Sequence, residues 1–413
     1  MTGIHIVGIG MTRLGKFPDR SVKDLTREAV STALQDAGAG MGDIQAAWFA
    51  NTRQAMMEGQ NTIRGQCALR SMGIQGIPIV NVENACASGS TALREAYAHI
   101  KARMCSVALV VGADKMFFPD NKDAMFRAFI GGTDVHKLDE TRAQLASLGQ
   151  RLQAEGGKET SIGVHSFFMD VYAAFARLHM QMFGTTTEQL AAAAAKNHYH
   201  STMNPLSQYQ IDMTTEQVLA DAMVAWPLTR SMCAPISDGA AAAVVCSSEE
   251  LHRFDRSRAV RVAAVALTSS SDREAGDFDR HIGRVTALQA YEAAGLGPED
   301  MDVAEVHDAC SFAEIVQIEN LGFCARGEGG PITAAGDTRL GGRIPVNVSG
   351  GLVSKGHPVG ATGVIQLHEL VTQLRGEAGK RQVEGARIAI AENGGGFWGV
   401  EEAATTVTIL AKG

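Results

Sequence analysis

The sequence Asn84-Ala85-Cys86-Ala87-Ser88-Gly89-Ser90 joins a predicted strand to a predicted helix. The apolar run 77–82 precedes it, and in the segment that follows it apolar side chains recur at helical spacing. Cys86 is therefore expected at a helix N-terminus, where free backbone N–H groups and the positive end of the helix dipole favour a thiolate. This is a suitable position for a nucleophile, although a cysteine near a strand end can equally be a small core residue.

The same arrangement occurs a second time near the end of the chain. Val80-Asn81-Val82 leads to Cys86, and Val346-Asn347-Val348 leads to His357. An alanine- and glycine-rich helical pattern follows in both cases. The chain thus contains an internal repeat. If a pseudo-twofold axis relates the two copies, the helix starts that carry Cys86 and His357 should lie close to each other.

The segments upstream of these motifs also correspond. In 25–50 and in 285–307, a helical pattern is followed by an apolar strand pattern. Each half reads as β-α-β-α-β, which predicts an α/β fold of two tandem halves with a largely parallel sheet covered by helices. We expect an N-terminal half made of residues 1–114 and 229–250, an inserted loop domain at 115–228, and a C-terminal half at 251–413.

Length, charge, cysteine content and the length of the apolar runs exclude several classes of protein. The chain has 413 residues, of which 45% are hydrophobic, so it can bury large cores. The formal net charge is -8, and the sequence has no dense block of Lys and Arg, which argues against nucleic acid as a partner. The seven cysteines form no CxxC pair, so neither a disulfide framework nor a metal site is expected. No apolar run is long enough to span a membrane, and we expect a cytoplasmic protein.

Four motifs resemble those of the thiolase superfamily, and in particular its sterol-carrier-protein-type branch. The resemblance covers nearly the whole chain, and it implies five alternating layers, αβαβα, with an inserted loop domain. The block around Gly356-His357-Pro358 is the most specific of the four. The motifs are Asn84-Ala85-Cys86-Ala87-Ser88-Gly89, His307-Asp308-Ala309-Cys310, the stretch 347–363, and Glu392-Asn393-Gly394-Gly395-Gly396.

The resemblance assigns roles to individual residues. Cys86 would take an acyl group from coenzyme A as a thioester, and His357 would remove the proton of its thiol. One oxyanion hole would consist of the backbone N–H groups of Cys86 and Gly394. A second would consist of His357 and His307. Without the resemblance, His307 could equally be a hydrogen-bonded structural residue.

One part of the family pattern is missing. Thiolases use a second cysteine as the acid and base for the α-carbon proton, either before the final glycines or at the third position of the His-Asp motif. This chain has Glu392 at the first place and Ala309 at the second, and Cys310 follows one residue later. Three alternatives for the missing acid and base stay open. It could be Glu392 with a pKa raised by burial, which we favour, or it could be Cys310. The third alternative is that the α-proton step itself is altered.

The expected function is that of a thiolase-like acyltransferase. It would form an acyl-cysteine and cleave or form a C–C bond of a 3-oxoacyl-CoA, with a bulky or aromatic acyl group as one option. Coenzyme A would be a substrate, and no permanently bound cofactor is expected. The alternatives are a retro-aldolase-type lyase acting on a CoA-linked side chain and a non-catalytic lipid-binding or scaffold subunit.

The resemblance also implies partners. The residues that would bind coenzyme A cannot be identified from the sequence. Acyl-CoA thioesters would be the small-molecule partners. A homodimer or a larger oligomer is expected. Some members of this branch work with a small subunit that carries an OB-fold and a zinc ribbon, so the chain could belong to such a complex.

Overall fold

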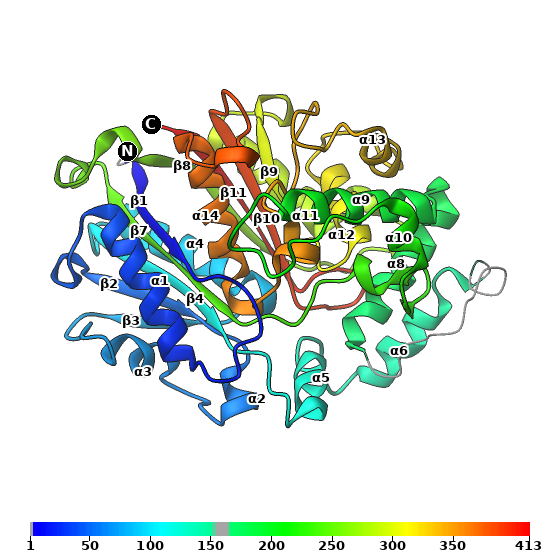
Figure 1. The fold of residues 1–413 in the computed structure, drawn as a ribbon, viewed down its shortest axis with the longest axis horizontal. Coiled ribbons are helices and arrows are strands. Elements are labelled where there is room, and N and C mark those ends of the chain that lie inside the picture. The colour runs from blue at the N-terminus through cyan, green and yellow to red at the C-terminus, as the bar shows by residue number, and fades with distance from the viewer. Residues whose placement is uncertain (1–2, 151, 153–164) are drawn as a thin grey trace.

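The computed structural model describes residues 3–150, 152 and 165–413. Within these residues, a nine-stranded sheet has the order β3-β2-β4-β7-β1-β8-β11-β10-β9 (Figure 1). The first five strands come from the predicted N-terminal half, 1–114 and 229–250, and the last four from the predicted C-terminal half, 251–413. The strands are β1 (Ile4–Met11), β2 (Ala46–Ala50), β3 (Ile79–Val82), β4 (Val107–Asp114), β7 (Gly239–Ser247), β8 (Val260–Ser269), β9 (Val303–Glu305), β10 (Ile388–Gly395) and β11 (Ala404–Lys412).

The strand order confirms the internal repeat. In the first half β2, β4, β7 and β1 follow one another across the sheet, and in the second half β9, β10, β11 and β8 do the same in mirror order. The halves meet where β1 pairs with β8, at His5 with Arg261 and Ile6 with Val260. The predicted largely parallel sheet is wrong, because only β2–β3, β2–β4 and β9–β10 run parallel. β7 and β11 return antiparallel beside strands that precede them in the chain.

Helices form the alternating layers. α1 (Val22–Ala37) and α3 (Arg64–Arg70) cover the N-terminal half of the sheet, and α11 (Ile282–Ala294) covers the C-terminal half. α4 (Ser88–Lys101) and α14 (Thr362–Arg375) contact each other and strands of both halves, so they lie between them. The αβαβα arrangement is thereby confirmed.

Local sequence explains where these helices begin and what they bury. At the start of α1, the Ser21 side chain accepts from the Asp24 backbone N–H and the Asp24 carboxylate accepts from the Ser21 N–H, which is a capping box. Gly38 ends α1 in the left-handed conformation. The predicted apolar face of α4 lies in the core between the two halves, with Ala92, Leu93, Ala96 and Ile100 buried.

A separate set of elements lies between β4 and β7. Its helix α9 packs against α12 (Ser311–Asn320) and α13 (Gly329–Ala335) of the C-terminal half. The predicted boundary at 228/229 falls inside a small hairpin, and the division into domains stays a prediction. No helix of the described part of the chain is long and apolar enough to cross a membrane. The inserted elements are α5 (Lys122–Ile130), α6 (Leu138–Ser147), α8 (Phe167–Phe183), α9 (Thr187–Ser201), α10 (Thr215–Ala220), β5 (Met223–Ala225) and β6 (Leu228–Thr229).

Candidate active site

Cys86 lies in a short 3-10 turn, Ala85–Ala87, that leads directly into α4. The Ser88 hydroxyl accepts from the Asn84 N–H at 2.8 Å and donates to the Ala85 carbonyl at 2.6 Å. Ala85 has φ of 48°, a left-handed conformation that costs energy for a residue with a side chain. The turn holds Cys86 at the N-terminal end of α4, as the sequence predicted.

His357 lies in the corresponding segment before α14. Its backbone N–H donates to the Ser237 hydroxyl at 2.9 Å, and its Nδ1 lies 2.7 Å from the Thr362 hydroxyl. That hydroxyl donates its own hydrogen to the Pro358 carbonyl at 3.1 Å. It must therefore accept from Nδ1–H, because a hydroxyl has one hydrogen to give. The tautomer that results leaves Nε2 of His357 free to act as a base.

The structure brings the two helix starts together. The Cys86 Sγ and one ring nitrogen each of His307 and His357 all lie within 4.8 Å of one another. The two imidazole centroids are 5.2 Å apart at 64°. Glycine permits the approach of α4 to α14, since a Cβ at Gly363 would lie 2.3 Å from the Ser90 backbone nitrogen. Three of the four predicted catalytic side chains thus form one cluster.

Burial sets the protonation of this cluster. It lowers the pKa of His307 to about 4 and that of His357 well below its usual value, so both rings are neutral near pH 7. Both ring nitrogens of His307 lack a hydrogen-bond partner within the described residues. Burial also raises the pKa of Cys86 to about 12, against the opposing charge of Arg53. The resting sulfur is therefore a thiol, not the thiolate expected at a helix N-terminus, and it needs a base.

A cysteine and two histidines are also ligands that zinc accepts. Within the described part of the chain, Cys86, His307 and His357 are the one such group close enough to share an ion. Cys86 and His357 line a large cavity, and the imidazole of His357 is neutral and can act as a base. The chemistry of the cluster favours acid–base and nucleophilic work.

Glu392 lies behind His307, in β10. Its Oε2 accepts from the His307 backbone N–H at 3.0 Å, while Oε1 has no hydrogen-bond partner among the residues described. Burial and the nearby Glu402 carboxylate raise the pKa of Glu392 well above its usual value. Burial therefore favours the protonated form of this carboxyl group. It does not belong to the 4.8 Å cluster, so the structure places this predicted residue one layer further from the sulfur.

The glycine run that follows Glu392 closes over Cys86. The amide that points at the sulfur, together with the N–H of Cys86 itself, is that of Gly396. Gly395 allows the contact, because a Cβ there would lie 2.2 Å from the Asn84 carbonyl oxygen. Gly394 is paired with Thr405 inside the sheet. The role predicted for Gly394 stays a prediction, and Gly396 is a second donor that sequence reasoning missed within the same run.

Cys310 lies outside this cluster. Its side chain is fully buried in an apolar cluster that includes Phe167 and Val353, and burial raises its pKa to about 12. Ala309, at the position where the resemblance implies a cysteine, lines the cavity beside Cys86 instead. The thiol, one residue further along the chain, lies in the core instead, and neither it nor Glu392 lines the cavity. Glu392 accepts a hydrogen bond from the His307 backbone N–H, which joins it directly to a residue of the cluster.

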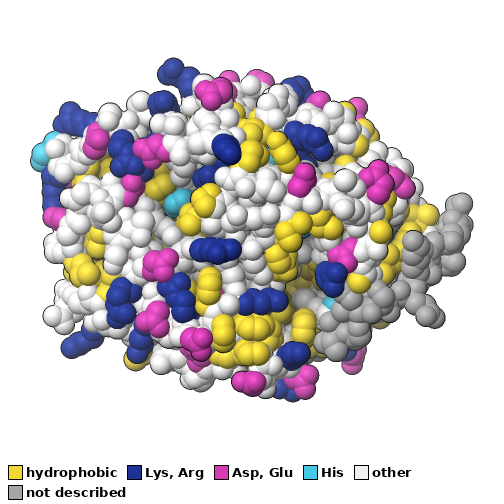
Figure 2. Space-filling model, viewed as in Figure 1, with side chains coloured by type: hydrophobic (Ala, Val, Ile, Leu, Met, Phe, Trp, Pro, Cys, Tyr) yellow, Lys and Arg dark blue, Asp and Glu magenta, His cyan; other side chains and the backbone are white. Residues whose placement is uncertain are grey.

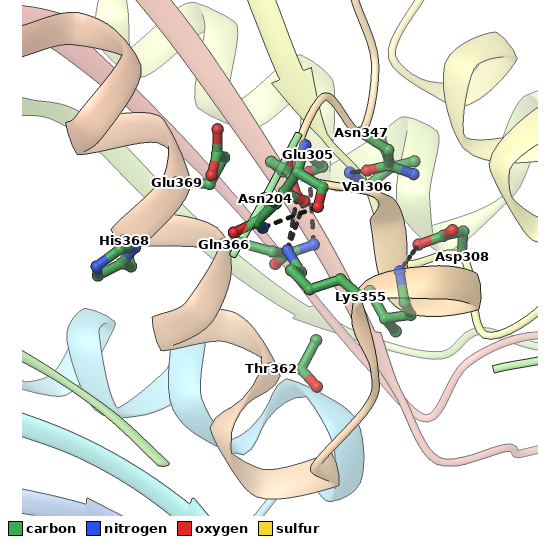
Figure 3. A network of polar contacts seen from close by, with 12 residues as sticks. Asn204, Glu305, Val306, Asp308, Asn347, Lys355, Thr362, Gln366, His368 and Glu369 are labelled. Carbon is green, nitrogen blue, oxygen red and sulfur yellow. Dashed lines mark hydrogen bonds and ion pairs between the residues drawn. The ribbon is translucent and has the colours of Figure 1, made fainter. Parts of the chain in front are cut away.

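A buried ionic network anchors the segment that leads to His357 (Figure 3). Lys355 Nζ lies 3.0 Å from Glu305 Oε2 and donates to the Ser349 hydroxyl at 2.6 Å. The Asp308 carboxylate accepts from the Leu352 backbone N–H at 2.6 Å. Glu305 ends β9 and Asp308 follows His307, so the network ties the two histidine segments to each other.

Replacement of Lys355 by Met should lower the free energy of unfolding by about 3–5 kcal/mol, because Glu305 would be left as an unpaired buried charge. Urea denaturation followed by tryptophan fluorescence and circular dichroism would measure the loss. The double variant Lys355→Met, Glu305→Leu should recover most of it, since no lone charge remains. A loss below about 1 kcal/mol for the single variant would show that the pair behaves like an exposed one.

A cavity of about 670 Å³ opens in front of Cys86 and His357. Its walls come from α8, from α5 and from the short helix α2 (Gln54–Glu58). Apolar side chains gather at the lower edge of the molecule, where α2 and α5 lie (Figure 2). The apolar lining includes Met56, Met116, Phe126, Phe129, Ile130, Phe168 and Met169.

A second cavity of about 860 Å³ adjoins the first. The two share the stretch Cys233-Ala234-Pro235 in their walls. The second is more polar, and Lys16 and Arg230 line it together with Tyr209. Together the two cavities could take a thioester whose acyl part is apolar and whose other end is polar and anionic.

Comparison with known proteins agrees with this geometry. Residues 4–249 match the thiolase N-terminal domain, and residues 231–412 match the thiolase C-terminal domain-like family. An acetyl-CoA acetyltransferase of Methanothermobacter thermautotrophicus is 38% identical, with 97% of this chain and 98% of the relative covered. Sterol carrier protein 2 of Oryctolagus cuniculus is 35% identical, with 94% and 69% covered.

Solved structures agree in fold. An Ltp2-ChsH2(DUF35) aldolase superposes with a TM-score of 0.76 at 23% identity, over 99% of this chain and 98% of the other. Human mitochondrial 3-ketoacyl-CoA thiolase in complex with CoA superposes with a TM-score of 0.69 at 17% identity, over 100% and 98%. At these identities the likeness is one of fold.

Proposed function

This chain belongs to the thiolase family of acyl-CoA C-acyltransferases, and from that premise we propose that it cleaves 3-oxoacyl-CoA thioesters through an acyl group on Cys86. The observation that carries the proposal is the cluster of Cys86, His307 and His357 within 4.8 Å at the wall of an apolar cavity. A neutral imidazole beside a protonated thiol supplies a base next to a nucleophile.

The first half-reaction forms the acyl-enzyme. His357 Nε2 takes the proton of the Cys86 thiol, and the sulfur attacks the 3-oxo carbon. The oxygen that becomes negative accepts from the backbone N–H groups of Cys86 and Gly396, with Gly394 as the donor that the resemblance implies. The bond between the α-carbon and the 3-oxo carbon then breaks, and its electron pair forms an enolate. His307 and protonated His357 donate to the enolate oxygen.

Protons balance over the second half-reaction. Glu392 gives its proton to the α-carbon of the enolate, and the CoA thioester that contains this carbon leaves. The ionised Glu392 then regains a proton from solvent, and the incoming coenzyme A thiol gives up its own proton to solvent. The coenzyme A sulfur attacks the acyl group, Cys86 leaves as a thiolate, and protonated His357 returns its proton to the sulfur.

The two cavities suggest how the substrate lies. The acyl group would occupy the apolar cavity in front of Cys86. The volume of this cavity, about 670 Å³, and its aromatic lining side chains Phe126 and Phe168 suit a bulky or aromatic acyl group. The pantetheine arm would pass Ala234 into the more polar cavity, where Lys16 and Arg230 can meet the phosphates of coenzyme A. Coenzyme A enters as a substrate and leaves as a product.

Intact-protein mass spectrometry tests the proposal. The purified chain is mixed with short, branched and aromatic acyl-CoA thioesters, and an added acyl mass is expected for at least one of them. A chain that binds coenzyme A and yet gains no acyl mass from any thioester would overturn the acyltransferase proposal. The retro-aldolase-type lyase or the lipid-binding role would then be favoured.

We further propose that the protein is a homodimer. β3 is an open edge of the sheet within the described chain, and Val80 on it is 39% exposed. Such an edge invites pairing with another strand. Light scattering is expected to give twice the mass of one chain, and Val80→Lys should give monomers. A wild-type mass equal to that of one chain would refute the dimer.

We also propose a small subunit with an OB-fold and a zinc ribbon as a partner. Co-purification of such a subunit with this chain would test that proposal.

A further inference from the structure

Arg53 is a cation in the acyl cavity that the proposed reaction does not use. It follows β2 as the N-cap residue of α2, and its side chain lines the cavity that contains Cys86 and His357. Its charge is close enough to lower the pKa of the Cys86 thiol and that of His357. No ion pair with its guanidinium occurs within the described residues.

The guanidinium is held firmly on two sides. Its face stacks on the Phe129 ring with 4.2 Å to the centroid, and Nη1 donates to the Ala128 carbonyl. The backbone N–H of Arg53 donates to Asp114 at 2.9 Å, and the same carboxylate accepts from the Gly360 N–H at 2.6 Å. Arg53 is therefore fixed relative to the segment that contains His357.

One edge of the guanidinium has no partner. Nε is buried without a hydrogen bond, and Nη2 makes none with the residues described. The N–H bonds of Nε and Nη2 run parallel, which is the fork that a carboxylate fills with two hydrogen bonds. Glu83 lines the same cavity, but it is exposed and its Oε1 accepts from the Ala85 N–H at 2.7 Å.

We propose that Arg53 binds a carboxylate carried by the acyl group of the substrate, so that the enzyme acts on acyl-CoA thioesters with an apolar body and a second, free carboxylate. The inference rests on the acyl-transfer function proposed above. The phosphates of coenzyme A are separated from its sulfur by the whole pantetheine arm. The anion that reaches a cation near Cys86 therefore belongs to the acyl part.

Two thioesters of the same shape test this proposal. Succinyl-CoA carries the carboxylate, and isocaproyl-CoA replaces it by an isopropyl group. The rate at which each one acylates Cys86 is measured by intact-protein mass spectrometry and by release of coenzyme A. The wild-type chain is expected to react about 10-fold to 100-fold faster with succinyl-CoA.

Variants assign that preference to Arg53. Arg53→Met should remove it, and Arg53→Lys should keep part of it, since a lysine retains the charge without the fork. Arg94→Met is the control, because Arg94 pairs with Glu95 on α4 and lines neither cavity. Circular dichroism verifies that each variant is folded.

The outcomes separate the two proposals. Equal wild-type rates for both thioesters would overturn the role of Arg53 and leave the acyltransferase in place. The same is true if Arg53→Met slows both thioesters by the same factor, since Arg53 would then act on the Cys86 thiolate alone. If neither thioester nor any other acylates the wild-type chain, the acyl-transfer function itself fails.

Discussion

Replacement of Cys86 by Ala should abolish the acyl adduct and lower turnover of 3-oxoacyl-CoA by about 10⁴-fold to 10⁶-fold, the range seen when an enzyme loses its nucleophile. The side chain is small and lies in a 3-10 turn held by Ser88 and Asn84, so the fold should be unaffected. Turnover is followed by thiolysis of the substrate at saturating coenzyme A. The adduct is followed by intact mass.

The matched control for this change is Cys233→Ala. Cys233 also lines the cavity, but it does not belong to the cluster of Cys86, His307 and His357. The Cys233 variant should keep both adduct and turnover. Cys86→Ala with full turnover would contradict an acyl-cysteine mechanism and favour the retro-aldolase-type lyase, in which no thioester to the enzyme forms.

The repeat made most of the fold predictable. Matching patterns before Cys86 and His357 placed both residues at equivalent helix starts, and the packing of α4 against α14 brings them together as symmetry required. Strand direction was not predictable. Periodicity indicates that 239–247 is buried on both faces, but it does not tell whether that strand enters the sheet beside β1 in the same or the opposite direction.

The residues of the site could be predicted where a sequence motif determines their chemistry. They were harder to predict where the packing of the folded chain determines their charge or leaves a hydrogen-bonding group free. Cys86, His307 and His357 follow from motif residues, and they meet in space. The charge state of Cys86 did not follow, because helix position favours a thiolate while burial opposes it more strongly. Arg53 was missed altogether. It has no motif around it, and its importance lies in a free hydrogen-bonding edge that only the packed structure reveals.

Glu392→Gln should separate the proton transfer to the α-carbon from the transfer of the acyl group. The glutamine oxygen can still accept from the His307 N–H, so the position of His307 should be kept. Cleavage of 3-oxoacyl-CoA is expected to fall by about 10²-fold to 10⁴-fold, the usual contribution of a placed proton donor. Exchange of an acyl group between coenzyme A molecules involves no α-carbon proton, and it should continue near the wild-type rate.

The pH dependence of the cleavage rate gives an independent test of the role of Glu392. Burial raises the pKa of Glu392 and favours its protonated form, so cleavage by the wild-type enzyme should be present below this raised pKa and should fall as the pH rises through it. The fall should be absent from acyl exchange and from the residual cleavage of Glu392→Gln. The measurement is the rate of each reaction over a series of buffers, with folding checked at each pH.

Cys310→Ala decides between the two candidates for the missing acid. Cys310 lies in the apolar core and does not line the cavity, so its removal should leave cleavage close to wild type and cost mainly stability. If cleavage instead falls in Cys310→Ala and survives in Glu392→Gln, the proton passes through the thiol. If Glu392→Gln slows cleavage and exchange by the same factor, Glu392 only positions His307, and the α-carbon proton has another source.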